Sequence, residues 1–438
     1  MTNPQLIKFK RDLIAIYFTL HYVKNYLNKN YATCFGFAAK TECLESHISG
    51  IISRLQYNSL KNKYNPEDCG PSDPYRKSVV SRFNNESGKK FLRANILCIK
   101  PWISEKEKGV FMIKYTEIMN ALPFLFDMEK LQEKYDLVIE PSWESPYEMY
   151  SAFLPLKSDI FVQSLSIRER ELHAAHGFKP VPLTAGDWVN IESFYPDESI
   201  AKKYDFCIIS NFIPVKRYPY LLSALSKYWT GDLKFAIAAS SHVGHKREWI
   251  ENLLKKYGLF DNADIFIEVK HTQINEILNA SYCHVLASRR EGANKANFES
   301  MMAGTPVVVL KTHIGFPNWK FTPPLVANYT TPQDLVTAIK SSKTTTRAEV
   351  AKAASEMIGY IHASNTLNKE IKKVSLSRGD EWTVDILPKI NRVHLFYGNQ
   401  EDTRKCIKDY QFIESIIYEK SYYQASLAIE RFSKNESI

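Results

Sequence analysis

The stretch SRREGANKANFESMMAGTPVVVL, residues 288–310, decides the fold that we predict for this chain. The apolar run before it predicts a strand that ends at Ala287, and a second apolar run begins at Pro306. Between the two runs, Asn294 is typical of a residue that caps the start of a helix, and Gly304 of the residue that ends one. A strand, a turn, a helix and another strand in direct succession predict part of a parallel α/β sheet.

The helix predicted to begin at Lys295 has the chemistry to bind a diphosphate. The first backbone N–H groups of a helix have no partner within it, and the helix dipole favours a negative group there. Lys295 adds a full positive charge, and Glu299 on the first turns can accept hydrogen bonds from the two hydroxyls of a ribose. By themselves, Glu291 and Glu299 would more commonly be two solvated carboxylates. The strand that follows at Gly304-Thr-Pro-Val-Val instead favours a ligand site.

This segment resembles the family-4 glycosyltransferases of the GT-B fold, whose mark is a pair of glutamates separated by seven residues. Glu291 and Glu299 have that spacing, and Ala303 to Val308 is similar to the family's ending of a small residue and Gly-x-Pro-Val-Val. The resemblance implies that Glu291 holds hydroxyls of the donor sugar and Glu299 the ribose of the nucleotide. It also implies a retaining transfer from a UDP- or GDP-linked sugar without a cofactor.

The residues after the first glutamate depart from the family. Its Gly-Phe-Gly is replaced here by Gly292-Ala293-Asn294. Contact between the phosphates and the backbone of these three residues is still expected, whereas the shape of the sugar pocket should differ.

A second match follows the first strand of the same unit. The segment SNFIPVK, residues 210–216, resembles the family's Gly-Arg-x-x-Pro-x-Lys loop, with Ser210 and Asn211 at the first two positions. Lys216 falls on the family's lysine, which neutralises the leaving diphosphate. Asn211 stands in place of the arginine, so a bidentate guanidinium is lost. Arg217 is the neighbour that can replace it, provided that its side chain bends back.

Weaker matches extend the predicted donor site. The loop after Glu268, which contains Val269, lies where the family seats the nucleobase against the backbone. Gly109, predicted to open the first helix after the first strand, matches a family glycine that faces the phosphates, although a glycine serves any turn equally well. The segment 182–196 is similar to the family's connection between domains.

The predicted fold is therefore α/β of the GT-B type: two Rossmann-like doubly wound domains that face a cleft, with helical extensions at both ends. In the second domain, five apolar runs predict strands, and in such sheets ligands bind beyond their carboxyl ends. These runs are Phe206–Ser210, Lys234–Ala239, Asp264–Glu268, Cys283–Ala287 and Pro306–Leu310. The predicted divisions are a helical extension with a linker (1–90), an acceptor domain (91–200), a nucleotide-sugar domain (201–345) and a helical tail that partly packs on the acceptor domain (346–438).

The N-terminal segment 6–28 has an apolar stripe with helical spacing, flanked by basic residues. Such a helix can lie in a membrane interface, but we favour packing on the protein's own core. The polar segment 58–90, with its prolines and glycines, predicts a long loop. A final helix is expected at about 402–431.

Composition narrows the class of protein. The net charge of +9 is spread along the chain, and no nucleic-acid-binding motif is present, which argues against a nucleic-acid partner. The seven cysteines form no Cys-x-x-Cys pair, and no signal peptide or membrane span is evident, so we expect a cytoplasmic protein. No Asp-x-Asp motif occurs, and the spacing of His242 and His245 lacks a third ligand, so we predict no metal site.

The sequence thus predicts a hexosyltransferase-type glycosyltransferase that acts in cell-surface polysaccharide synthesis. Its expected partners are a nucleotide sugar and a glycan or lipid-linked acceptor. The basic charge and the N-terminal apolar stripe indicate a third partner, an anionic membrane surface at the inner face of the membrane. Two alternatives stay open: a module that binds a sugar nucleotide without turnover, which Asn211 motivates, and a sugar-nucleotide epimerase.

Overall fold

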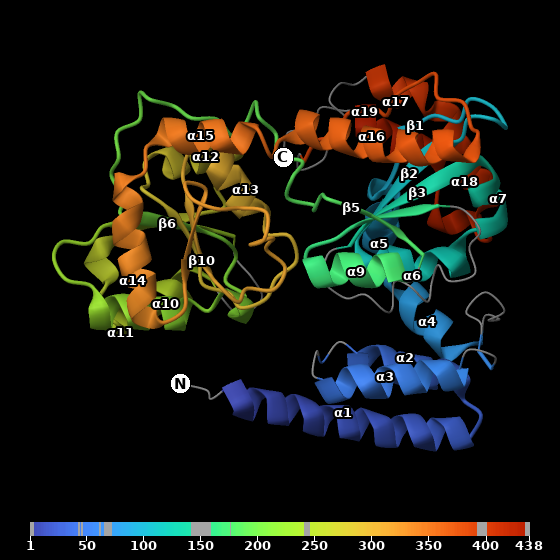
Figure 1. Ribbon diagram of the computed structural model, residues 1–438, viewed down its shortest axis with the longest axis horizontal. Helices are drawn as coiled ribbons and strands as arrows, with labels where there is room; N and C mark the ends of the chain where they lie inside the picture. Colours follow the sequence, from blue (N-terminus) through green and yellow to red (C-terminus); the bar gives the residue numbers. More distant parts are fainter. Residues whose placement is uncertain are drawn as a thin grey trace.

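A computed structural model describes most of the chain as two sheet-containing domains with helices at both ends (Figure 1). The described residues are 4–42, 44, 47–60, 63–64, 72–141, 159–175, 177–240, 246–391 and 401–433. The predicted pair His242 and His245 lies outside them.

The first domain is built on a five-stranded sheet in the order β1-β2-β3-β4-β5. β1 and β2 are antiparallel, and the remaining pairs are parallel. Its strands are β1 (Ile96–Lys100), β2 (Gly109–Lys114), β3 (Tyr135–Glu140), β4 (Ile160–Gln163) and β5 (Lys179–Val181). The helices between them are α6 (Thr116–Leu125), α7 (Met128–Lys134) and α9 (Ile167–Ala175). β1, β2, β3 and β4 are buried throughout, as expected for strands covered on both faces.

The prediction that Gly109 opens a helix is wrong, because Gly109 is the first residue of strand β2. A Cβ added to it would lie 2.6 Å from the ring of Tyr135 and 2.8 Å from the carbonyl oxygen of Lys100. Gly109 is therefore needed for close strand packing, and the first helix after this strand is α6.

The second domain contains a six-stranded parallel sheet in the order β11-β10-β9-β6-β7-β8. Its strands are β6 (Phe206–Ile209), β7 (Phe235–Ala239), β8 (Ala263–Ile267), β9 (His284–Leu286), β10 (Val307–Leu310) and β11 (Val326–Tyr329). Its helices are α10 (Tyr218–Tyr228), α11 (Arg247–Lys256), α12 (His271–Asn279), α13 (Lys295–Met302), α14 (Pro332–Ser341) and α15 (Arg347–Ser355). The strand order reverses between β6 and β9, so the crevice of this sheet opens where these two strands end.

The C-terminal helices pack against the first domain. Figure 1 shows α16 (Tyr360–Arg378) passing from the second domain across the first. Residues of α16 and of the last helices share one hydrophobic core with β1, β2 and β3. The single helix expected at 402–431 is in fact three helices: α17 (Glu401–Lys405), α18 (Ile407–Ile416) and α19 (Ala425–Ser433).

The N-terminal helices form a separate layer beside the first domain (Figure 1). They are α1 (Pro4–Leu27), α2 (Tyr31–Glu42) and α3 (His47–Leu60), with a small core that includes Tyr22, Cys34 and Phe35. The loop expected at 58–90 is partly helical, since it contains α4 (Pro74–Val80) and the start of α5 (Glu86–Ala94). Asp73 caps α4 and Asn85 caps α5, each by accepting a backbone N–H bond.

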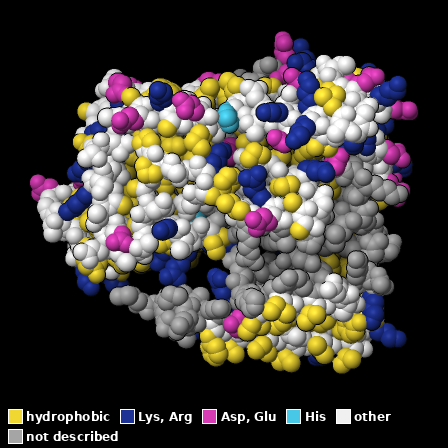
Figure 2. Space-filling view, viewed as in Figure 1, with side chains coloured by type: hydrophobic (Ala, Val, Ile, Leu, Met, Phe, Trp, Pro, Cys, Tyr) yellow, Lys and Arg dark blue, Asp and Glu magenta, His cyan; other side chains and the backbone are white. Residues whose placement is uncertain are grey.

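The expectation that the α1 stripe packs on the protein's own core is wrong. Leu20 is 66% exposed and Leu27 is 76% exposed, and Figure 2 shows a hydrophobic band along α1. The exposed apolar side chains of this layer are Phe9, Leu13, Ile14, Ile16, Tyr17, Leu20, Val23 and Leu27 of α1, with Ile48, Ile51 and Leu55 of α3. The helix instead turns Ala15 and Tyr22 toward its neighbours. Among the described residues, no helix is both long and apolar enough to cross a membrane.

Candidate functional site

The loops that follow β6 and β9 meet at the crevice of the second sheet. Lys216, from the loop after β6, forms an ion pair with Glu291, from the loop after β9. The same carboxylate oxygen of Glu291 accepts a 2.9 Å hydrogen bond from the side-chain amide of Asn294. Glu291 and Asn294 are buried, and Lys216 is nearly so. Two residues that the sequence predicted from separate motifs are therefore in direct contact.

Asn294 has a different role from the one predicted. It is the residue before the first turn of α13, but its side chain makes no capping hydrogen bond. Its amide group is committed to Glu291, so the N–H groups at the start of α13 are left to other partners.

The loop that carries Glu291 is held by a neighbouring loop that the sequence did not single out. The Glu291 N–H donates to the carbonyl of Ile314 at 3.0 Å, and the Ile314 N–H donates to that of Arg289 at 2.9 Å. Gly315 has a φ of +98°, and a Cβ on it would lie 1.7 Å from the carbonyl oxygen of Glu291. His313 accepts the N–H of Phe316 through Nδ1, so its Nε2–H is left to donate to Ser288. Burial, together with the charge of Lys216, lowers the pKa of His313 to about 3, so His313 is neutral.

The start of helix α13 faces a cavity between the two domains. Lys295 is the first residue of the helix, as predicted. The cavity has a volume of about 420 Å³. Its lining is Ile209, Lys216, Glu291, Ala293, Asn294, Lys295 and Ala296 from the second domain, with Tyr115, Glu140, Pro141 and Ala185 opposite. The helix end that the sequence predicted as an anion site is therefore open to a ligand-sized space.

Glu299 lies on α13, one turn beyond Lys295, and is partly buried. Burial raises its pKa to about 7, against the opposing charge of Lys295. A carboxyl whose ionised form lacks solvation gains from any ligand that donates hydrogen bonds to it. This is the property expected of a group that binds ribose hydroxyls.

The remaining predicted residues of the β6 loop support its shape. The Ser210 hydroxyl lies 2.8 Å from that of Tyr218 and donates to the carbonyl of Asn211. Arg217 has a left-handed backbone conformation, its guanidinium donates to the carbonyl of Ala287 at 3.0 Å, and it lies 3.9 Å from the ring centre of Tyr220. Arg217 does not line the cavity and therefore does not replace the missing family arginine there.

The cavity lining does not include Glu299, Ser210, Asn211 or Arg217, nor the predicted residues Gly292, Val269 and Gly109. Gly292 lies in the turn between Glu291 and Ala293. Val269 follows β8, two strands away from β6, and packs partly buried against the core of this domain. Gly109 starts β2 and packs against Tyr135, so it neither opens a helix nor lines the cavity.

The first domain contributes charged residues that the sequence did not predict. Glu140, at the carboxyl end of β3, lines the cavity and accepts a 2.7 Å bond from Lys389, with Lys114 at 3.7 Å. Burial alone would raise the pKa of Glu140, but Lys389 and Lys114 lower it, so Glu140 is ionised. Burial lowers the pKa of Lys389 to about 8, although Glu140 opposes that shift. Glu140 could have been predicted, because it is the last residue of a strand whose carboxyl end faces the ligand crevice. Lys389 could not, because it comes from a distant segment of the chain.

Among the described residues, Cys98, Cys406 and Asp409 come close enough together to share an ion. The two thiols contact carbonyl oxygens, and Asp409 accepts bonds from the Tyr135 hydroxyl and the Trp102 N–H. The cluster is buried in the first domain and does not line the cavity.

Comparison with known proteins places a family match on this part of the chain. Residues 191–319 match the family described as Glycosyl transferases group 1. No curated protein matches the chain.

Solved structures provide distant similarities. Sucrose-phosphate synthase from Thermosynechococcus elongatus is 13% identical with a TM-score of 0.47, over 61% of this chain and 74% of that chain. Anabaena HepE, solved with UDP, is 14% identical with a TM-score of 0.48, over 74% and 89% of the two chains. The pneumococcal O-GlcNAc transferase GtfA, solved with UDP and GlcNAc, is 15% identical with a TM-score of 0.43, over 57% and 54%.

The chain is built as two α/β domains, each on a mainly parallel sheet. Residues 191–319, which contain β6 to β10 of the second domain, are similar to the group 1 glycosyl transferases, and this similarity supports glycosyl transfer as the reaction class.

Proposed function

We propose that this chain transfers a hexose from a nucleoside-diphosphate sugar to a glycan or lipid-linked acceptor, in the synthesis of cell-surface polysaccharide. One observation carries the proposal: the start of α13, with Lys295, opens on a cavity that Lys216 and Glu291 also line. Backbone N–H groups, two lysines and a carboxylate around one space match a diphosphate joined to a sugar.

In the proposed site, the diphosphate lies against the start of α13, Lys216 and Lys295. Glu299 accepts hydrogen bonds from the ribose, and Glu291 accepts them from the sugar hydroxyls. In the chain without donor, Lys216 and Asn294 both contact Oε2 of Glu291, and its Oε1 is buried with no hydrogen-bond partner among the described residues. Donor binding would draw Lys216 toward the phosphates and leave Glu291 to the sugar.

In the proposed reaction, the bond between C1 of the sugar and the β-phosphate oxygen breaks, and its electron pair leaves with the diphosphate. The acceptor hydroxyl oxygen bonds to C1 on the same face, and its proton passes to the departing phosphate oxygen. Fixed positive groups placed where charge develops are usually the largest catalytic contribution. Lys216, Lys295 and the helix N–H groups supply them, so we propose that the reaction needs neither a metal ion nor a cofactor.

A second candidate function is donor binding without turnover. It is favoured by Asn211, which replaces the family arginine, and by Arg217, whose guanidinium is held at Ala287 instead of in the cavity. Release of nucleotide from a panel of UDP- and GDP-linked sugars, with and without glycan acceptors, separates the two. Turnover supports the transferase, and binding without release supports the second candidate. Change of the donor sugar without an acceptor would instead indicate an epimerase.

The donor site itself is tested by titrating UDP and GDP into the chain and into Glu299→Ala. We expect the variant to lose roughly 10- to 100-fold in affinity, the value of one or two hydrogen bonds to a charged group. Glu276→Ala is the matched control, since Glu276 is exposed on the neighbouring helix α12. Unchanged affinity in Glu299→Ala would reject the ribose assignment.

The proposed partner of the exposed apolar band on α1 and α3 is an anionic membrane surface at the inner face of the membrane. Lys10, Lys24 and Lys29 are exposed on and beside α1. Asp12 is the one acidic residue of that helix, and it is partly buried. Apolar side chains beside exposed lysines favour a bilayer with acidic headgroups over a soluble partner. A lipid-linked acceptor would be reached from that position.

A further inference from the structure

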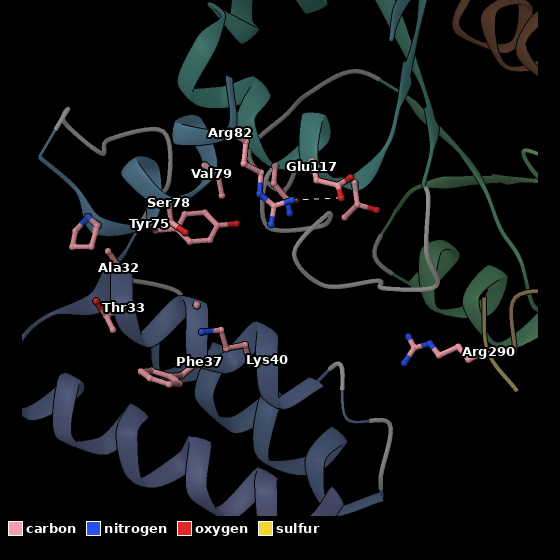
Figure 3. Close-up of a pocket in the computed structure, with 14 residues that line it drawn as sticks. Ala32, Thr33, Phe37, Lys40, Tyr75, Ser78, Val79, Arg82, Glu117 and Arg290 are labelled. Carbon is pink, nitrogen blue, oxygen red and sulfur yellow. Dashed lines mark ion pairs between the residues drawn. The ribbon is translucent and has the colours of Figure 1, made fainter. Parts of the chain in front are cut away.

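We infer that a second cavity, between the N-terminal helices and the two domains, binds a phosphate group carried by the acceptor. This inference rests on the proposed function and adds a chemical class to the acceptor. The cavity has a volume of about 640 Å³ and lies between α2 on one side and α4 and α6 on the other, with Arg290 reaching in from the second domain (Figure 3). It is therefore formed jointly by the N-terminal layer and both domains.

The linings of the second cavity and of the donor cavity are one residue apart in the chain at two places. Tyr115 and Glu291 line the donor cavity. Their immediate neighbours in the chain, Thr116 and Arg290, line the second cavity. One of these places is in each domain, so the two cavities are reached from the same two segments, one on each side of the cleft. An acceptor seated in the second cavity can present a hydroxyl to a donor sugar held by Glu291.

The lining of this cavity is basic. Lys40 of α2, Arg82 after α4 and Arg290 after β9 bring three cations from three separate segments, against the single carboxylate of Glu117. The guanidinium of Arg82 lies 3.5 Å from Glu117, drawn as the dashed line in Figure 3. A phosphate monoester carries a charge between −1 and −2 near neutral pH and accepts several hydrogen bonds, which matches the surplus of positive charge.

The Arg82–Glu117 ion pair leaves Arg82 available to a ligand. The side chains of Arg82 and Glu117 are 63% and 35% exposed, so solvent weakens their attraction. An arginine in such a pair exchanges a carboxylate for a phosphate at small cost, because both anions accept the same two parallel N–H bonds. Hydroxyl groups of Thr33, Ser78 and Thr116 line the same space and can donate to further phosphate oxygens.

The remaining wall is aromatic and apolar, formed by Phe37, Tyr75 and Val79. Such a wall suits a sugar ring or the first units of an isoprenyl chain. The phosphate is common to both kinds of acceptor, a phosphorylated sugar or a lipid phosphate, and the experiment separates them.

The test is a calorimetric titration of the full chain saturated with UDP or GDP, whichever binds. The soluble-sugar arm compares glucose 6-phosphate with glucose, and the lipid arm compares farnesyl phosphate with farnesol. We expect phosphate-bearing probes to bind in at least one arm and their neutral counterparts to bind at least tenfold more weakly. The arm that binds more tightly identifies the source of the phosphate.

The residues are tested by the double variant Lys40→Gln and Arg82→Gln. We expect it to lose at least tenfold in affinity for the phosphate-bearing probe and to keep its affinity for the nucleotide. The control is Lys106→Gln with Lys227→Gln, which removes the same charge at two exposed lysines elsewhere. Equal affinity of the two double variants for the probe, or no binding of any phosphate-bearing probe, would overturn the inference.

Failure of the proposed function gives a different result. If the chain binds no nucleoside diphosphate, the donor assignment fails, and the probe titrations are made without nucleotide. The comparison of the two double variants then still accepts or rejects the phosphate site.

Discussion

Glu299 and Lys295 lie one turn apart at the start of one helix, and the burial of Glu299 gives the donor site its dependence on pH. Burial raises the pKa of Glu299 to about 7 in the chain without ligand. Ribose hydroxyls donate to the ionised carboxylate, so binding releases a proton wherever Glu299 is protonated in the free chain. Affinity for nucleoside diphosphate should then fall as the pH drops through 7, by about tenfold between pH 8 and pH 6.

Calorimetric titration at several pH values measures this dependence. The nucleotide's own phosphate also titrates near pH 6, so Glu299→Gln is the control that retains only that contribution. A pH dependence that is the same in Glu299→Gln and in the parent chain would show that Glu299 does not bind the ribose.

Removing the Lys216 side chain should lower kcat. Its charge is placed where the leaving diphosphate gains negative charge, so Lys216→Ala should lower kcat by roughly 100- to 1000-fold. Lys227→Ala removes an exposed lysine of the same domain and should leave kcat unchanged. Steady-state release of nucleotide is the measurement, and a kcat for Lys216→Ala within threefold of the parent would remove Lys216 from the mechanism.

At the scale of elements, the loop around Gly315 holds the β9–α13 turn in place. A Cβ at Gly315 would lie 1.7 Å from the Glu291 carbonyl, and the φ of +98° disfavours a side chain there. Gly315→Ala should therefore displace the Glu291 loop, destabilise the chain by more than about 2 kcal/mol and weaken nucleotide binding.

Gly231→Ala is the matched control for this substitution. Gly231 has a φ of +85°, but a Cβ there would meet nothing within 4 Å, so only backbone strain of about 1 kcal/mol is expected. Urea unfolding and nucleotide titration measure both variants. Equal behaviour of the two would show that the contact between Gly315 and Glu291 does not shape the site.

The same elements show what sequence could predict. The strands and helices of the second domain follow from continuous apolar runs and capping residues, and α13 begins at Lys295 as predicted. The prediction of a helix at β2 is wrong because residues 109–114, GVFMIK, form a short apolar run, and such a run is equally compatible with a buried helix and a buried strand. The contacts of Ile314 and Gly315 with the Glu291 loop form between segments that are distant in the sequence, so no local pattern predicts them. The glycine at position 315 was the one sign of them in the sequence.

At the scale of the whole molecule, the sequence predicted the site residues better than it predicted how the helical layers pack on the two domains. An amphipathic stripe shows that one face of a helix is apolar but not what covers it, and the α1 stripe is exposed. The bond from Lys389 to Glu140 joins residues 249 positions apart, a separation that no local pattern encodes. Lys216 and Glu291 were each predicted from a separate motif, and they meet because parallel strands bring their carboxyl ends to one edge of the sheet.

The exposed face of α1 yields a prediction for the whole molecule. Leu20→Glu should reduce sedimentation with vesicles that contain anionic phospholipid by tenfold or more, because it replaces an exposed apolar side chain that would enter the bilayer with a charge that acidic headgroups repel. Leu376→Glu is the control, since Leu376 is 52% exposed on α16. Equal sedimentation of both variants would contradict membrane docking, and a dimer that Leu20→Glu dissociates would identify a second copy as the occupant.

A crystal structure of the chain with a bound nucleoside diphosphate tests the central claim most directly. We predict that the diphosphate contacts the backbone N–H groups at the start of α13, with Lys216 turned toward it and the ribose hydroxyls on Glu299. A nucleotide bound elsewhere, with the Lys216–Glu291 ion pair intact and Glu299 without a ligand contact, would contradict the account.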